Sequence, residues 1–315
     1  MFFFFVLVAT IVLLICLWPV ETDSLRPAVH PAINYEESVC RIEKLRAADP
    51  ADVADYGHLI FMTHGHRTAK AVVLYHGYTN CPRQYEKLAR MFFERGYNVY
   101  VPRVPYHGIG NLVTRQIGKL TLTDITAVCD SAVNVGRGLG EKVTVLGLSM
   151  GGVMAAWNAQ FRNDVDQAII IVPSFGWFFF PGVVRPIVNL CFCLPNLFLW
   201  WDPINRDHRK APYSMYHQFS THGMGHILRL GLSVLRAAQQ QPPATKQIVV
   251  LTNEADIAVD ERATQRLIAS WKAHGVPVKF FRFSRSLKME HDVIDPLHQY
   301  EKTDVVYQTI FDHLR

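Results

Sequence analysis

Short apolar runs alternate with longer amphipathic segments along most of the chain. The short runs are rich in Val and Ile and are bounded by turn residues, which is typical of buried strands. Strands are predicted at residues 57–63, 70–77, 97–102, 142–147, 167–174, 246–252 and 276–283. Helices are predicted from apolar residues at helical spacing at 82–96, 122–136, 150–161, 227–241, 261–275 and 304–314. Such alternation favours an α/β fold, with a mostly parallel sheet covered by helices on both faces.

An uncharged apolar segment opens the chain. Residues 2–20 contain no charged residue and one polar residue, Thr10. About 20 apolar residues span the hydrocarbon core as a helix, whereas a cleavable signal has a basic start and a site of small residues. Both features are missing here, so an uncleaved anchor is favoured over a signal peptide. We expect a single-pass N-terminal membrane anchor at 1–20, with the side of the membrane undetermined, and a polar stalk at 21–56.

Composition excludes several classes of protein. Half of the 315 residues are apolar and 19% are charged, which is too apolar for a disordered chain. The formal net charge is +5, but no dense Lys/Arg run and no nucleic-acid-binding motif occurs, so no nucleic acid is expected as a partner. The six cysteines lack the spacing of a zinc site, and no metal is expected.

The sequence VLGLSMGG, residues 145–152, places one serine between a predicted strand and a predicted helix. Gly147 and Gly151 stand where a Cβ would collide with the neighbouring helix and strand, so Ser149 fits the G-x-S-x-G nucleophile elbow. The helix behind the serine directs N–H groups, including that of Met150, toward a developing oxyanion. Gly/Ser turns also bind phosphates or only connect elements, so the motif needs partners elsewhere in the chain.

A second loop offers a partner for the oxyanion. His76 and Gly77 end an early predicted strand and are followed by Tyr78. Two donors from different loops are needed, and the N–H groups of Tyr78 and Met150 are the natural pair. His76 itself is expected to hold the loop. With these motifs in this order, the chain resembles the α/β-hydrolase superfamily, in the group of monoacylglycerol lipases and bacterial carboxylesterases.

The resemblance covers residues 57–315 and implies the α/β-hydrolase fold, with a cap inserted at about 174–226. It also places the acid after the strand that follows the cap. That stretch offers Glu254, Asp256 and Asp260. Asp256 matches the family position, whereas Asp260 is better suited to begin the next helix. His291 follows the last predicted strand and is the candidate base, with His298 as its rival. Serine, acid and histidine then occur in the chain order of this fold.

The cap segment is strongly apolar. From Phe175 to Trp201, nine of 27 residues are aromatic. The segment is expected to pack as a core on the rim of the sheet, to form an acyl-binding lid that touches a bilayer, or to do both. Either arrangement puts an apolar cover over the serine, which favours an acyl chain over a sugar or a charged peptide.

These features predict a membrane-anchored serine hydrolase that cleaves carboxylic esters of lipid or medium-chain acyl type. Ser149 would attack, His291 would carry the proton, Asp256 would orient His291, and Tyr78 and Met150 would bind the oxyanion. The resemblance implies no metal or organic cofactor. Thioesterase, lysophospholipase or small-peptidase activity on the same triad remain alternatives, as does a non-catalytic hydrolase-fold protein that binds at the membrane.

Overall fold

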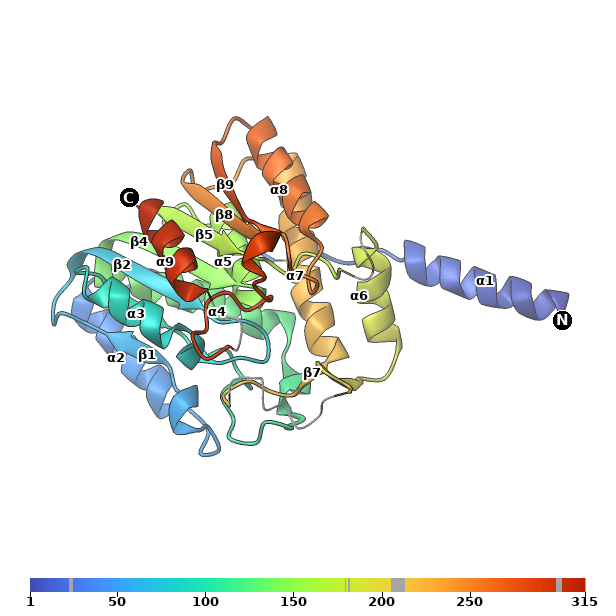
Figure 1. Cartoon of the computed structure of the whole chain (residues 1–315), viewed down its shortest axis with the longest axis horizontal. Helices are drawn as coiled ribbons and strands as arrows, with labels where there is room; N and C mark the ends of the chain where they lie inside the picture. The colour runs from blue at the N-terminus through green and yellow to red at the C-terminus, as the bar shows by residue number, and fades with distance from the viewer. Residues whose placement is uncertain (23–24, 179, 181, 205–212, 299–301, 315) are drawn as a thin grey trace.

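A computed structural model describes residues 1–22, 25–178, 180, 182–204, 213–298 and 302–314. Within these residues the centre is a seven-stranded sheet of order β1-β3-β2-β4-β5-β8-β9 (Figure 1). Its strands are β1 (Ile60–Met62), β2 (Thr68–Tyr75), β3 (Asn98–Val101), β4 (Gly140–Leu148), β5 (Gln167–Ile171), β8 (Ile248–Asn253) and β9 (Val278–Phe283). β1 pairs antiparallel with β3, and the other neighbouring strands are parallel. The predicted mostly parallel α/β sheet is confirmed.

Alternating side chains of the strands form two apolar layers, because successive residues of a strand point to opposite faces. Val72 and Leu74 of β2 pack beneath helices α3 (Glu86–Phe93) and α9 (Thr303–Asp312). Val73 and Tyr75 belong to the opposite layer. Its helices are α4 (Leu122–Leu139), α5 (Met150–Phe161), α7 (Thr221–Gln240) and α8 (Glu261–Ala273). Both faces of the sheet are therefore covered, which explains why its strands read as nearly continuous apolar runs.

The cap lies between β5 and α7. It contains helix α6 (Val184–Cys193) and a small antiparallel sheet of β6 (Phe198–Trp200) and β7 (Gln218–Ser220). Helix α6 packs against α7 (Figure 1). At this contact Cys191 and Phe192 of α6 lie next to Gly225 of α7. The predicted insertion at about 174–226 thus includes the first residues of α7.

The segment expected as a polar stalk contains helix α2 (Tyr35–Ala47), which lies against α4 (Figure 1). Asn34 caps this helix by accepting the N–H of Glu37. Ser38 donates its hydroxyl to the carbonyl of Val135 on α4 at 2.8 Å, and Ile42 is fully buried in the core. Residues of this segment therefore help to cover the sheet domain.

The N-terminal apolar segment forms helix α1 (Phe2–Leu17), which projects from the body (Figure 1). At about 1.5 Å per residue, its 16 residues reach about 24 Å, short of the roughly 30 Å hydrocarbon core. The helix ends here because Trp18 precedes Pro19, and a residue before proline disfavours helical backbone; Trp18 has ψ 131°. No helix in the described residues is long and apolar enough to span a membrane. The prediction of a transmembrane anchor and of a membrane localisation through it is therefore wrong, and a membrane partnership through this helix is not supported.

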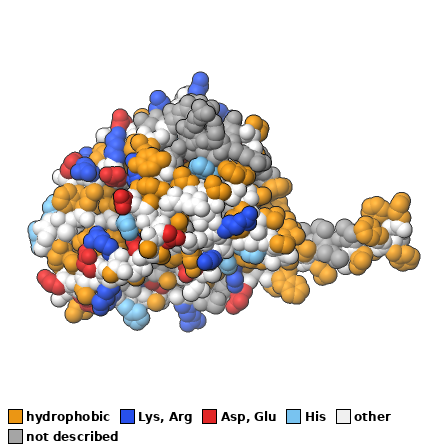
Figure 2. Space-filling model, turned by 90° about the horizontal axis from the view of Figure 1, so that it is seen from below, with side chains coloured by type: hydrophobic (Ala, Val, Ile, Leu, Met, Phe, Trp, Pro, Cys, Tyr) orange, Lys and Arg blue, Asp and Glu red, His pale blue; other side chains and the backbone are white. Residues whose placement is uncertain are grey.

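Space-filling views set α1 apart from the body. Hydrophobic side chains dominate the described surface of the projecting helix, whereas the body on the same face mixes charged groups of both signs (Figure 2). The end of α1 is held to the cap, since the Asn189 amide on α6 donates to the carbonyls of Ile15 and Trp18 at 2.7 and 3.0 Å.

Candidate active site

Ser149 occupies a strained turn between β4 and α5. Its backbone has φ 60° and ψ −113°, a region that residues with a Cβ rarely adopt. Neighbouring backbone holds it there: the Ser149 N–H donates to the carbonyl of Ile171 at 3.0 Å, and the Ser174 N–H donates to the carbonyl of Ser149 at 3.2 Å. Such strain persists only where the surroundings fix it, and the turn places the serine at the carboxyl edge of the sheet.

Two glycines make this turn possible. A Cβ at Gly147 would overlap the backbone of Gly151, and a Cβ at Gly151 would overlap the carbonyl of Tyr75 on β2. The G-x-S-x-G spacing is therefore a steric requirement of the turn, as the sequence predicts.

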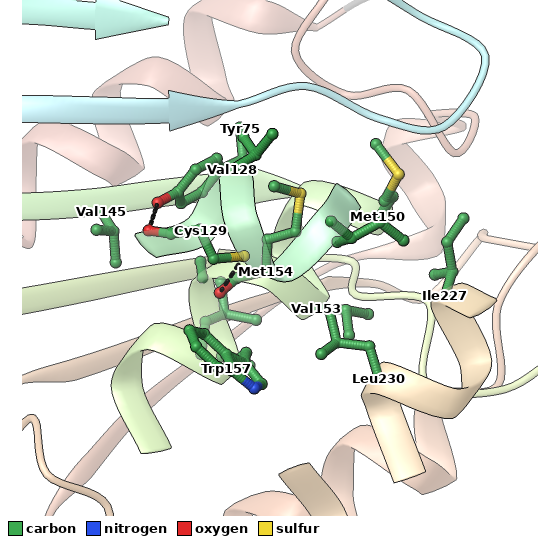
Figure 3. Close-up of a cluster of buried hydrophobic side chains, with 14 of the residues drawn as sticks. Tyr75, Val128, Cys129, Val145, Met150, Val153, Met154, Trp157, Ile227 and Leu230 are labelled. Atoms are coloured by element: carbon green, nitrogen blue, oxygen red, sulfur yellow. Dashed lines mark hydrogen bonds between the residues drawn. The ribbon is translucent and has the colours of Figure 1, made fainter. Parts of the chain in front are cut away.

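Helix α5 carries the turn on a rigid base. Its residues Met150, Val153, Met154 and Trp157 are buried (Figure 3). Around them lie side chains of β2, β4, α4 and α7, among them Tyr75, Val128, Cys129, Val145, Ile227 and Leu230 (Figure 3). Close packing of this kind resists displacement, so the elbow is fixed in position relative to the sheet.

Asp256 and His291 form a hydrogen-bonded pair at the same edge. Asp256 follows β8 and His291 lies in the loop after β9, and their Oδ2 and Nδ1 atoms are 2.6 Å apart. The other carboxylate oxygen of Asp256 accepts the N–H of Ala258 at 2.7 Å. With Nδ1 donating to the carboxylate, Nε2 of a neutral His291 is the acceptor that can take a proton.

Electrostatics favour the charged form of His291. Burial lowers its pKa, but the charge and hydrogen bond of Asp256 outweigh burial, with a smaller contribution from Asp292, so the pKa of His291 is raised above its ordinary value. A carboxylate that stabilises the imidazolium in this way is what a base needs after it has accepted a proton.

Ser149 and His291 line one cavity of about 1070 Å³. The hydroxyl of Ser149 lies 2.9 Å from that of Ser174, and the described residues contain no hydrogen bond between Ser149 and His291. Catalytic hydrogen bonds are often long or unformed without substrate. The three predicted residues are thus brought to one place, with Asp256 paired to His291 and Ser149 facing the same space.

Apolar side chains form much of the cavity wall. They come from the cap, from α7 and from the loop after β8, and include Trp177, Trp201, Met224, Ile227, Leu228 and Ile257. The volume is at the upper end of ordinary ligand sites, and polar side chains such as Asn80, Ser174 and His291 complete the lining. Such a cavity suits an apolar chain with one reactive polar group.

The predicted oxyanion donors belong to two different segments of the chain. Tyr78 follows β2 and lines the cavity, and Met150 is the first residue of α5. Within the part of the chain that the structure describes, neither N–H donates to a backbone acceptor. The Tyr78 hydroxyl exchanges hydrogen bonds of 3.2 Å with the backbone of Ser220, which ties this loop to the cap.

His76 also holds the loop of Tyr78 in place. It is fully buried, its Nε2 accepts the N–H of Val104 at 3.2 Å, and its Nδ1 lies 3.0 Å from the carbonyl of Gly77. Burial, and then the nearby His107, lower its pKa well below the ordinary value, so the ring is neutral. Nδ1 is then the donor to Gly77, which agrees with the loop-holding role expected for His76.

The rival residues occupy other roles. Asp260 is the N-cap of α8 and accepts the N–H of Arg262, as expected for a helix start. Glu254 accepts the N–H of Arg285. His298 lines the cavity, but its Nδ1 lies 3.3 Å from Glu290 and not beside Asp256. The pairing with Asp256 thus identifies His291, and not His298, as the candidate base. Sequence spacing alone does not make this choice.

Two contacts at this site have no signature in the sequence. Ser174 meets the Ser149 hydroxyl from the loop after β5, and Gln84 bonds to the N–H of Gly77 at 2.8 Å. Ser174 reaches Ser149 because β4 and β5 are neighbouring strands, whereas Gln84 lies seven residues from Gly77 in the segment after β2. No group of three or more His, Cys, Asp or Glu among the described residues is arranged to hold a metal ion.

Comparison with known proteins places this geometry in a family. Residues 66–282, more than half of the chain, match the hydrolase family described as serine aminopeptidase, S33. The chain belongs to this α/β-hydrolase family. A thermostable monoacylglycerol lipase from Bacillus sp. (strain H-257) is 29% identical over 94 residues, which are 30% of this chain and 36% of the relative. The match therefore spans about a third of that relative's length.

Several solved structures share the fold of this chain. A structure from the work on LipS and LipT, described as metagenome-derived lipolytic enzymes, has a TM-score of 0.63 at 17% identity and covers 82% of this chain and 98% of its own. The monoacylglycerol lipase of Paleococcus ferrophilus has a TM-score of 0.60 at 21% identity, covering 82% and 100%. A soluble variant of the Saccharomyces cerevisiae monoglyceride lipase has a TM-score of 0.56 at 13% identity, covering 82% and 92%. The chain is thus an α/β-hydrolase related to monoacylglycerol lipases.

Proposed function

We propose that this protein is a serine hydrolase that cleaves carboxylic esters carrying lipid or medium-chain acyl groups. The observation that carries the proposal is the 2.6 Å pair of Asp256 and His291 on the cavity faced by the strained Ser149. A nucleophile, a base and a group that orients the base are the three parts of a Ser-His-Asp hydrolase.

The proposed reaction uses these groups in order. Ser149 Oγ leaves Ser174 and attacks the ester carbonyl carbon, while Nε2 of His291 takes the hydroxyl proton. Asp256 stabilises the imidazolium, and the N–H groups of Tyr78 and Met150 bind the oxyanion. The tetrahedral intermediate collapses when His291 gives the proton to the departing alcohol. Water, activated by His291, then hydrolyses the acyl-enzyme and restores Ser149.

The lipid-like acyl group is supported by the cavity wall. Trp177, Trp201 and Leu228 stand over a space of about 1070 Å³, and burial of apolar surface contributes about 0.8 kcal/mol per CH₂ group. Longer acyl chains should therefore bind better until they fill the cavity. The named relatives are monoacylglycerol lipases, which agrees with this choice of substrate class.

A fluorophosphonate probe tests the nucleophile. The wild-type protein should be labelled, Ser149→Ala should not, and Ser131→Ala, which removes a half-buried hydroxyl on α4, should be labelled like wild type. An unlabelled wild type, or equal labelling of Ser149→Ala, would refute the enzyme proposal and leave a binding protein with a hydrolase fold.

A substrate panel tests the bond and the acyl group. p-Nitrophenyl esters from acetyl to dodecanoyl should show kcat/KM rising with chain length into the medium range. Acyl thioesters, lysophospholipids and aminoacyl amides should be poorer substrates. A clear preference for acetyl, or for an aminoacyl amide over every ester, would overturn the assignment of substrate class.

A further inference from the structure

A buried glutamine joins the loop of Tyr78 to the loop of His291. Gln84 lies in the short helical turn Pro82–Tyr85 and is 1% exposed. Its Oε1 accepts the N–H of Gly77 at 2.8 Å, and its Nε2 donates to Oδ2 of Asp292 at 2.6 Å. Asp292 directly follows His291, so one side chain connects two loops that are 208 residues apart.

Asp292 is the fixed end of this connection. Its Oδ1 accepts the backbone N–H groups of Ile294 and Asp295 at 3.2 and 3.1 Å, so its own loop holds it. Its Oδ2 accepts from Gln84 and, at 3.2 Å, from the Asn80 amide. A carboxylate that accepts several hydrogen bonds makes stronger and shorter contacts than a neutral acceptor. Asp292 is thus a firm point of attachment for the loop of residues 77–84.

The attachment of this loop to Asp292 helps to fix the direction of the Tyr78 N–H. The carbonyl of Gly77 and the N–H of Tyr78 belong to one planar trans peptide, so they point in opposite directions. His76 holds that carbonyl, and Gln84 holds the N–H on the other side of Gly77. Because both the N–H and the carbonyl of Gly77 are hydrogen-bonded, the peptide between Gly77 and Tyr78 cannot rotate without breaking a buried hydrogen bond.

We infer that Gln84 and Asp292 are positioning residues that align the Tyr78 oxyanion donor with the loop of the His291 base. This inference rests on the proposed function. Loss of a whole oxyanion donor costs about 10²–10³ in kcat. Loss of its alignment should cost less, on the order of 10–100-fold in kcat, with little change in KM because the apolar wall is untouched.

The test begins with Gln84→Met, which keeps side-chain volume and removes both hydrogen bonds. The matched control is Gln116→Met, because Gln116 also donates to an aspartate, Asp52, but lies outside the cavity lining. We expect kcat for a p-nitrophenyl octanoate substrate to fall roughly 10–100-fold in Gln84→Met and to stay near wild type in the control. Affinity for a trifluoromethyl ketone, which forms a tetrahedral adduct, should fall by the same factor as kcat.

Exchanging the hydrogen-bond donor and acceptor between Gln84 and Asp292 makes the test sharper. In Asp292→Asn an amide nitrogen faces the Gln84 amide donor, and in Gln84→Glu a carboxylate faces Asp292, so each single variant should lose kcat. In the double variant Gln84→Glu/Asp292→Asn, the new carboxylate can accept from both Gly77 and the new amide. We expect it to recover to within about 5-fold of wild type, the remainder reflecting the longer Asn80 contact.

The outcomes separate the two proposals. If wild type neither reacts with fluorophosphonate nor cleaves esters, the proposed function fails. If wild type is active and Gln84→Met has wild-type kcat, or the folded double variant is no better than the single variants, the positioning role fails and the proposed function stands. A fall in thermal stability with unchanged kcat per folded molecule would likewise refute positioning, since it would show a purely structural role.

Discussion

The sheet domain and the cap contain similar apolar side chains but bury them very differently. Ile169, Ile170 and Ile171 of β5 are fully buried between two strands and two helical layers. In the cap, Leu190 is 47% and Leu194 45% exposed. A central parallel strand has neighbours on every side, whereas α6 packs against α7 and the end of α1 and leaves other positions open to solvent. Hydrophobicity alone therefore does not say whether a residue stabilises the fold.

Within α6, the buried and the exposed apolar residues lie on different faces of the helix. Val184 and Val188, four residues apart and on one face, are buried. Leu190, two residues after Val188, falls on the opposite side of the helix and is exposed. Other apolar residues of the cap, such as Trp177, face the cavity. The apolar content of the cap thus exceeds what its packing uses, and the part that faces the cavity is available to substrate.

The largest expected effect is a difference in kcat between variants of two aspartates of the sheet domain. Asp256→Asn should lower kcat about 10⁴-fold with the fold intact, because the amide no longer stabilises the imidazolium and favours the wrong tautomer. Asp260→Asn, at the N-cap of α8, should leave kcat near wild type and change stability by less than about 1 kcal/mol. Kinetics with p-nitrophenyl octanoate measure both. Comparable kcat for the two variants would remove Asp256 from the triad.

Truncation of core and cap aromatics tests the contrast in burial directly. Trp157→Ala, in the fully buried base of the elbow, should reduce the free energy of unfolding by about 3–5 kcal/mol. Phe192→Ala, on the partly exposed α6, should cost under about 1 kcal/mol. Urea unfolding followed by circular dichroism gives both values. Equal losses would mean that the cap contributes to the domain's stability as the core does.

A smaller effect is expected at the contact between cap and oxyanion loop. Trp201 donates its indole N–H to the Thr79 hydroxyl at 2.9 Å. Trp201→Phe keeps an aromatic wall but removes this hydrogen bond, which is worth about 1 kcal/mol, so kcat/KM for octanoyl esters should fall about 5-fold. Trp271→Phe, which loses a bond to Gln160 far from the cavity lining, is the control for general destabilisation. A larger loss in the control would show that stability, not the cap contact, sets the rate.

The parts of the molecule that follow local rules could be predicted from the sequence. The parallel sheet follows from its strand pattern, and the elbow follows from Gly147 and Gly151, where a Cβ has no room. Family position predicts Asp256 and His291 as acid and base, and the structure supplies the geometry of the pair. The sheet and the elbow depend on rules that act over a few residues, whereas the prediction of Asp256 and His291 depends on the resemblance to the family.

Features that depend on contacts between distant segments could not be predicted. The end of helix α1 before Pro19 is a different case, because it follows a local rule that the apolar length of the segment alone does not take into account. Gln84 meets Asp292, and Ser174 meets Ser149, only because β2, β4, β5 and β9 order the loops along one sheet edge. Polar contacts of this kind leave no periodic pattern and no characteristic residue spacing in the sequence.

The smallest predicted effect concerns the pH dependence that Asp292 confers on His291. His291 must be neutral to act as base, and Asp256 and Asp292 together raise its pKa against the effect of burial, so activity is lost on acidification at a higher pH than for an ordinary histidine. Asp292→Asn removes one negative charge, which lowers the pKa of His291 and moves the acid limb of the kcat/KM profile to lower pH. Gln84→Met breaks the same connection but keeps the charge, so its rate should fall while its acid limb stays in place. An acid limb that moves in both variants, or in neither, would show that the charge of Asp292 does not reach His291.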